Sequence, residues 1–216
     1  IGHTATQWTS LIHEGLRLSR FPETKIYLQI TRGPAPRDHP FPIDLAPTTV
    51  LTFRELRPLE PSVRHAGVRA ATTPDVRWGR CDIKSVNLLP NVLARQQAKE
   101  AGVFEAILIR EGLVTEGSVS NVMVVRNGTV QTAPEGPRIL SGVTRAIVLE
   151  LARKEGLPVS EAFVTREELF TASEVFLTGT TVEVLPVVLI DGRVIGTGGP
   201  GPVSQILARR WDAMVG

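Results

Sequence analysis

Two dipeptides that favour tight turns, each beside short β-like runs, constrain the fold most strongly. Asn127-Gly128 separates the apolar run Val122–Val125 from Thr129–Gln131. Asp191-Gly192 leads into Arg193–Ile195. Both dipeptides suit two-residue hairpin turns, because asparagine, aspartate and glycine tolerate the positive φ that these turns need. The sequence therefore predicts antiparallel β-hairpins.

Helical patterns of apolar residues are interspersed with further β-like runs. Other strands are predicted at Lys25–Thr31, Phe104–Ile109, Glu174–Leu177 and Val182–Ile190. Helices are predicted around Trp8–Leu16, Leu88–Gln96 and Ile147–Ala152, and after Thr165 and Pro202. Residues 48–73 are predicted to be extended, with turns at Pro58–Pro61 and Gly67, and a domain boundary is expected between residues 40 and 66. We expect an α/β fold of mixed sheets in two domains, residues 1–58 and 59–216.

Composition excludes several classes of protein. The 216 residues carry a net charge of +2, the basic residues are scattered, and aromatic residues make up 5%, so no nucleic-acid surface or membrane partner is indicated. The single cysteine, Cys81, excludes an internal disulfide framework and suits a reducing compartment, so a cytoplasmic protein is expected. The four histidines are dispersed, so no metal site is predicted. Neither a dinucleotide fingerprint nor a phosphate loop is present.

The stretch Arg80–Leu89 places one lysine, Lys84, between the apolar run Val76–Trp78 and a helix. The apolar run is expected to be extended, and Ser85 or Asn87 is expected to cap the helix. A lysine amine becomes nucleophilic when burial or a cationic neighbour lowers its pKa from about 10.4 toward about 7–8. Taken alone, Lys84 is better explained as a solvated side chain.

Three further segments are more polar than packing requires. Glu116 offers a carboxylate beside Gly117, and the segments Gly142–Thr144 and Gly179–Thr181 offer amides and hydroxyls. An imine-forming lysine, a carboxylate for a ring nitrogen and a phosphate cup are what pyridoxal phosphate requires. The residues alone leave simpler roles open, namely a solvated turn, a helix cap and strand-end hydroxyls.

Three motifs resemble the signatures of the fold-type IV pyridoxal-phosphate aminotransferases, in order and in spacing. They are Cys81-Asp82-Ile83-Lys84-Ser85-x-Asn87, Thr115-Glu116-Gly117-Ser118-x-Ser120-Asn121 and Ile139-Leu140-x-Gly142-Val143-Thr144-Arg145. The resemblance implies the two-domain architecture of that family and pyridoxal 5'-phosphate as cofactor. It also implies that Lys84 forms the internal aldimine and moves the substrate proton, and that Glu116 pairs with the ring nitrogen.

The resemblance assigns the remaining cofactor contacts as well. Leu140 would pack against the ring, while Val143, Thr144 and Thr180 would hold the phosphate. Ser118, Ser120 and Asn121 are expected to shape the turn after Glu116 rather than to contact substrate.

The N-terminal part is most similar to D-amino acid aminotransferases. Tyr27-x-Gln29-x-Thr31-Arg32-Gly33 is followed by Arg37-x-His39. In those enzymes an Arg and a His on this loop bind the substrate carboxylate, and the loop reaches the neighbouring subunit. The resemblance thus implies ping-pong transfer from a D-amino acid to a 2-oxo acid, substrate binding by Arg37 and His39, and a homodimer with shared active sites.

Alternatives remain open within and beyond this family. Branched-chain L-amino acid aminotransferases and aminodeoxychorismate lyases share the cofactor motifs, and an inactive truncated homologue is a more distant possibility. Gly179 stands where the D-specific enzymes carry a serine. The chain does not begin with Met, and a family segment bearing a phosphate-binding arginine and a tyrosine is expected to precede Ile1.

Overall fold

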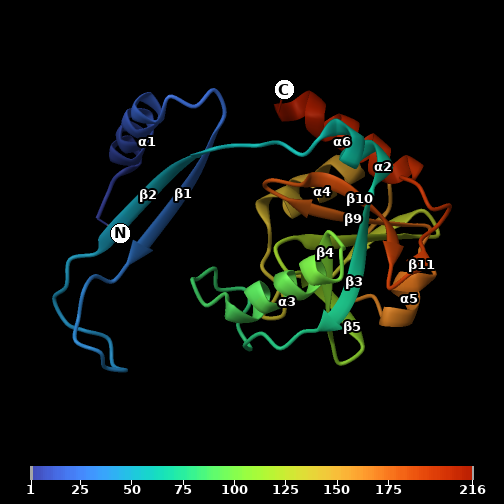
Figure 1. Ribbon diagram of the computed structural model, residues 1–216, viewed down its shortest axis with the longest axis horizontal. Helices are drawn as coiled ribbons and strands as arrows, with labels where there is room; N and C mark the ends of the chain where they lie inside the picture. Colours follow the sequence, from blue (N-terminus) through green and yellow to red (C-terminus); the bar gives the residue numbers. More distant parts are fainter. Residues whose placement is uncertain (1, 216) are drawn as a thin grey trace. The chain divides into compact units, whose positions relative to one another are not determined.

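The computed structural model describes residues 2–215, which form two compact units, Ile1–Pro58 and Leu59–Gly216 (Figure 1). Among the described residues, every helix is too short or too polar to cross a membrane.

The first unit consists of one helix and a two-stranded antiparallel sheet. Helix α1 (Ala5–Ser19) begins with a reciprocal cap between Thr4 and Gln7. Strands β1 (Thr24–Thr31) and β2 (Thr48–Glu55) pair in antiparallel register. None of residues 2–58 is buried, so this unit has no core of its own.

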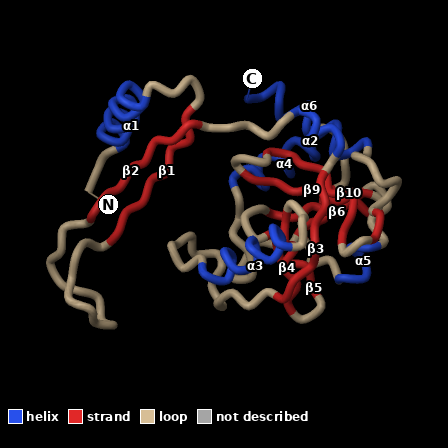
Figure 2. The backbone as a smooth tube through the Cα atoms, viewed as in Figure 1, coloured by secondary structure: helices blue, strands red, loops and turns tan. Residues whose placement is uncertain are grey.

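The second unit is built on a nine-stranded mixed sheet, whose strands are drawn in red in Figure 2. Its strands are β3 (Val68–Pro74), β4 (Glu105–Arg110), β5 (Leu113–Gly117), β6 (Asn121–Arg126), β7 (Thr129–Thr132), β8 (Val159–Glu161), β9 (Glu174–Gly179), β10 (Glu183–Ile190) and β11 (Arg193–Val194). The order is β5-β4-β3-β10-β9-β6-β7-β8, and β11 pairs with β10. Strands β3–β4, β3–β10 and β7–β8 are parallel, and the other neighbours are antiparallel.

Five helices accompany this sheet. They are α2 (Pro61–Ala66), α3 (Leu89–Glu100), α4 (Val143–Lys154), α5 (Arg166–Phe170) and α6 (Pro202–Val215). Helices α4 and α6 pack on β9 and β10, whereas α3 packs on β4. On β9, Val175 and Leu177 enter one apolar core and Phe176 enters the core beneath α4 and α6. Alternating side chains of one strand thus fill cores on both faces of the sheet.

The predicted hairpins are confirmed. Asn127 and Gly128 have φ of 48° and 74°, and Asp191 and Gly192 have φ of 49° and 74°. These values allow two-residue turns whose twist matches the strands that they join. The predicted capping box that begins at Thr165 is also confirmed.

Three local predictions are wrong. Val76–Trp78 is a loop, because the Asp75 side chain accepts hydrogen bonds from the backbone and guanidinium of Arg77 and turns the chain. Helix α3 begins after Leu88 without a side-chain cap, since the Ser85 hydroxyl instead accepts from the Asn87 amide. The stretch predicted to be extended over 48–73 contains α2, whose first residue is a proline, a residue well suited to a helix start.

Candidate active site

Glu116 lies near the end of β5 and is almost fully buried, with 5% of its surface exposed. Its carboxylate forms an ion pair with the guanidinium of Arg77. It also accepts hydrogen bonds from the Leu140 amide, 3.1 Å from each oxygen, and from the Asn121 side-chain amide at 2.9 Å. Burial raises the pKa of Glu116, while Arg77 and the Leu140 amide oppose that rise.

A second buried carboxylate, that of Asp75, holds the other side of Arg77. Its oxygens accept hydrogen bonds from Nε and Nη2 of Arg77, each at 2.9 Å, and from the Thr115 hydroxyl at 3.0 Å. The Asp75 carboxylate also forms an ion pair with Arg110 at 3.0 Å. Arg77 Nη2 also donates to the carbonyl of Arg138. Burial alone would raise the pKa of Asp75, but its bonds to Arg77 and Arg110 lower it to about 2. Burial alone would lower the pKa of Arg77, but Asp75 and Glu116 raise it.

The turn after Glu116 is fixed by a third buried carboxylate, Glu105, which is 0% exposed. The hydroxyls of Ser118 and Ser120 both donate to Glu105, as does the Ser118 amide at 3.2 Å. A Cβ on Gly117 would lie 2.3 Å from the Ser120 hydroxyl oxygen, so only glycine fits there. The two serines therefore shape this turn by binding Glu105.

Helix α4 begins directly beside the Glu116 carboxylate. Its N-cap, Gly142, makes no side-chain capping bond, and a Cβ there would lie 2.3 Å from Oδ1 of Asn121. Asn121 in turn donates to the carbonyl of Leu140 at 2.9 Å. At the helix start Thr144 is 5% exposed and Val143 is 77% exposed. The first amides of a helix have no acceptor within it, so this end favours an anion.

The end of β9 lies at the same turn. A Cβ on Gly179 would lie 3.6 Å from the carbonyl oxygen of Val119 and 3.9 Å from the Cα of Ser120. Thr180 follows in an exposed turn. The structure thus brings Glu116, Leu140 and the start of α4 to one end of the sheet, with the turn carrying Thr180 nearby.

Lys84 lies in the loop between β3 and α3, and this loop and the first turn of α3 are each tied to the same region. The Cys81 amide donates to the carbonyl of Pro137 at 2.8 Å, and the side-chain amide of Asn91 donates to the carbonyl of Ser118 at 2.8 Å. Lys84 itself is exposed. Within residues 2–215 its amine forms no ion pair or hydrogen bond with another side chain or the backbone.

Arg37 and His39 lie in the first unit, on the exposed loop between β1 and β2. The His39 amide donates to the Asp38 carboxylate at 2.7 Å, and the Arg32 guanidinium lies 3.7 Å from the centre of the Phe41 ring. The pair is accessible on this loop, and its role in binding substrate stays a prediction.

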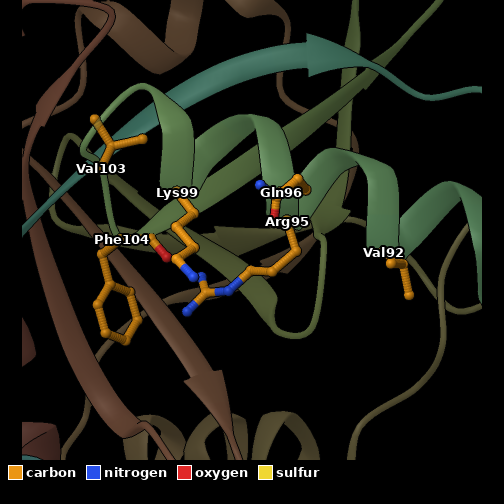
Figure 3. A pocket seen from close by; sticks show the side chains of 6 residues that line it. All are labelled: Val92, Arg95, Gln96, Lys99, Val103 and Phe104. Carbon is orange, nitrogen blue, oxygen red and sulfur yellow. The ribbon is translucent and has the colours of Figure 1, made fainter.

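A surface pocket lies elsewhere, along α3 (Figure 3). It has a volume of about 390 Å³ and contains none of the predicted site residues. Its lining consists of Val92, Arg95, Gln96, Lys99, Val103 and Phe104. Among the described residues, no cluster of three or more His, Cys, Asp or Glu side chains could bind a metal ion.

Sequence reasoning did not identify Asp75, Arg77 or Glu105 as parts of this site. The available signal was the spacing of Asp75 and Arg77, an acidic and a basic residue two positions apart after a strand. For Glu105 the signal was a carboxylate beside the apolar run 106–109. Such residues are almost never fully buried unless they are paired.

The chain is similar to known aminotransferases. A family model described as amino-transferase class IV matches residues 1–190. The D-alanine aminotransferase of Bacillus licheniformis is 51% identical over 181 residues, covering 83% of this chain and 63% of that protein. The D-alanine aminotransferase of Staphylococcus haemolyticus is 39% identical over 215 residues, covering 100% of this chain and 76% of that protein. This chain therefore spans only part of the length of these relatives.

Solved structures share the fold. The branched-chain aminotransferase of the thermophilic archaeon Thermoproteus uzoniensis, solved with norvaline, superposes with a TM-score of 0.85 at 30% identity, covering 99% of this chain and 72% of that one. The Escherichia coli branched-chain enzyme superposes with a TM-score of 0.88 over 99% of this chain and 73% of that one, and at 24% identity it supports the fold alone.

Proposed function

The chain belongs to the class IV aminotransferase family, and we propose that it uses pyridoxal 5'-phosphate to transfer the amino group of a D-amino acid to a 2-oxo acid. The observation that carries this proposal is the buried Glu116 carboxylate, bonded to the Leu140 amide just before the start of α4. Two relatives named D-alanine aminotransferase support the choice of substrate.

The residues of the second unit fit this cofactor. Arg77, Asn121 and Leu140 donate four hydrogen bonds to the Glu116 carboxylate, because the Leu140 amide is shared between both oxygens. We propose that the negative charge of this carboxylate pairs with a protonated ring nitrogen. We propose that the amides and hydroxyls of Val143, Thr144 and Thr180 hold the phosphate.

When bound, the cofactor supplies an electron sink that stabilises negative charge on the substrate α-carbon. Lys84 would hold the cofactor through Nζ, and the same amine would carry a proton from the substrate α-carbon. Leu140 would lie against the ring and help to exclude water. Residues 59–216 form the cofactor-binding domain in this proposal, and residues 1–58 are the remainder of a smaller N-terminal domain.

The loop of the first unit binds the other end of the substrate. The guanidinium of Arg37 matches a carboxylate bidentately, and His39 supplies a second donor. We further propose that the protein acts in the cytoplasm as a homodimer in which each loop serves the neighbouring subunit.

A visible absorption spectrum tests the proposal. With added pyridoxal 5'-phosphate the purified protein is expected to show the band of the Lys84-linked cofactor, which D-alanine removes and L-alanine leaves unchanged. Removal by L-leucine but not by D-alanine would replace the proposal with branched-chain L-transamination, and a response to aminodeoxychorismate alone would indicate a lyase. A protein that never forms the band would be an inactive homologue.

A further inference from the structure

The buried carboxylate of Glu116 is paired with a buried arginine, Arg77, which a ring-nitrogen partner does not by itself require. Arg77 binds both Asp75 and Glu116. The side chains of Arg77 and Glu116 are each 6% exposed, and that of Asp75 is 0% exposed. Each guanidinium nitrogen has an acceptor, since Nε and Nη2 bond Asp75 and Nη1 bonds Glu116. An arginine so held has a single orientation.

Burial favours the protonated form of the Glu116 carboxyl and so raises its pKa. A buried carboxyl without a cationic partner neutralises itself, and burial already raises the pKa of Glu116. A neutral Glu116 would lack the charge that a protonated ring nitrogen needs beside it. Among the groups identified around Glu116, Arg77 is the cation in direct contact.

We propose that Arg77, anchored by Asp75, is the positioning residue that keeps Glu116 ionised and fixes the orientation of its carboxylate for pairing with the cofactor ring. This inference rests on the proposed function, because a ring nitrogen gives the ionised carboxylate its task. Arg77 contacts neither cofactor nor substrate in this proposal and acts through Glu116.

The other titratable groups of this region do not replace Arg77. Arg110 reaches Asp75 rather than Glu116, and Asp75 is itself an anion that raises the pKa of Glu116. Burial also raises the pKa of the Cys81 thiol, which favours its neutral form, and a thiol cannot supply a positive charge in any case. Glu105, behind Gly117, is a further acid and binds the two serines.

The test measures the protonation of Glu116 in cofactor-free protein by infrared difference spectroscopy. Arg77→Gln is expected to show a protonated carboxyl band at pH 7 that disappears in the double variant Arg77→Gln/Glu116→Gln. Wild type is expected to lack the band. The control Arg126→Gln is also expected to lack it, because this variant removes a cation that pairs with Glu168 rather than with Glu116. An ionised Glu116 in folded Arg77→Gln, or a protonated one in wild type at pH 7, would overturn the proposal.

Arg77→Lys keeps the inference testable if Arg77→Gln does not fold. An ammonium lacks the planar fork with which Arg77 bonds Glu116 and both oxygens of Asp75 together, so the Glu116 titration midpoint is expected to move upward from wild type. An unchanged midpoint would contradict the proposal. These readouts need neither cofactor nor turnover, so they stay informative even if the proposed activity fails.

With cofactor added, folded variants are expected to bind it about tenfold or more weakly, as when a hydrogen bond to a charged group is lost. The KM for the D-amino acid is expected to stay within about twofold of wild type while kcat falls. A rise in KM with unchanged kcat would contradict a role exerted through Glu116.

Discussion

Lys84 and Glu116 occupy opposite environments, one an exposed loop and the other a buried ion-pair cluster. Replacing Lys84 with alanine is expected to abolish the visible cofactor band and to lower activity on the order of a thousandfold or more, because the attacking amine is lost. Stability should change by less than about 0.5 kcal/mol, since the side chain is exposed. Lys99→Ala, on the exposed face of α3, is the matched control and should retain the band.

Arg37 is predicted to act on substrate without contacting the cofactor. Arg37→Gln should raise the KM for D-alanine by about tenfold or more, because a charge-assisted hydrogen bond to a carboxylate is lost. Spectral titration with pyridoxal 5'-phosphate should be unchanged. Arg57→Gln, at a side chain 87% exposed, is the control, and an equal effect of both variants would argue against a specific carboxylate site.

Asp75 gives folding a pH dependence whose sign follows from its lowered pKa. The pKa falls from 3.8 to about 2 on folding, so the stabilisation is complete above pH 3.8 and is lost as the pH falls toward 2. This lowering of the pKa corresponds to about 2 kcal/mol in the free energy of unfolding. Urea unfolding at pH 6, 4 and 2 should show a steeper acid loss in wild type than in Asp75→Asn, and parallel curves would contradict the assignment.

At the scale of elements, the start of α4 depends on the absence of a side chain at Gly142. In Gly142→Ala the new Cβ would overlap Oδ1 of Asn121, so this variant should displace the Asn121 side-chain amide that donates to Glu116. We expect a loss of about 1–3 kcal/mol in the free energy of unfolding and weaker cofactor binding. In Gly199→Ala the new Cβ has open space, so its urea midpoint should match wild type.

Local signals in the sequence predicted elements better than they predicted the site cluster. Asn127-Gly128 and Thr165 act on neighbours within a few residues, so the hairpin and the cap could be read directly from them. Arg77, by contrast, meets Glu116 across 39 residues, and its loop conformation arises from that pairing together with Asp75. Arg77 lies within the apolar run Val76–Trp78, and nothing in that run indicates a partner as distant in sequence as Glu116. The run alone therefore predicts a strand.

At the scale of the whole molecule, the two units differ in what they bury. Residues 2–58 include no buried residue, whereas the second unit has cores on both faces of its sheet. We expect a segment of residues 59–216 to unfold cooperatively in urea when produced alone, and residues 1–58 to show no cooperative transition by circular dichroism. A sharp transition in the shorter segment would contradict this difference.

The central position of β3 has a consequence for how the protein is made. Strand β3 pairs with β4, which is synthesised soon afterwards, and with β10, in which Ile190 lies opposite Ala70. While the ribosome translates the intervening chain, the β10-facing edge of β3 is open beside the apolar side chain of Val68. Messages cut short before the codon for Ile190 therefore yield nascent chains with an uncovered strand edge, and these chains are expected to aggregate rather than fold.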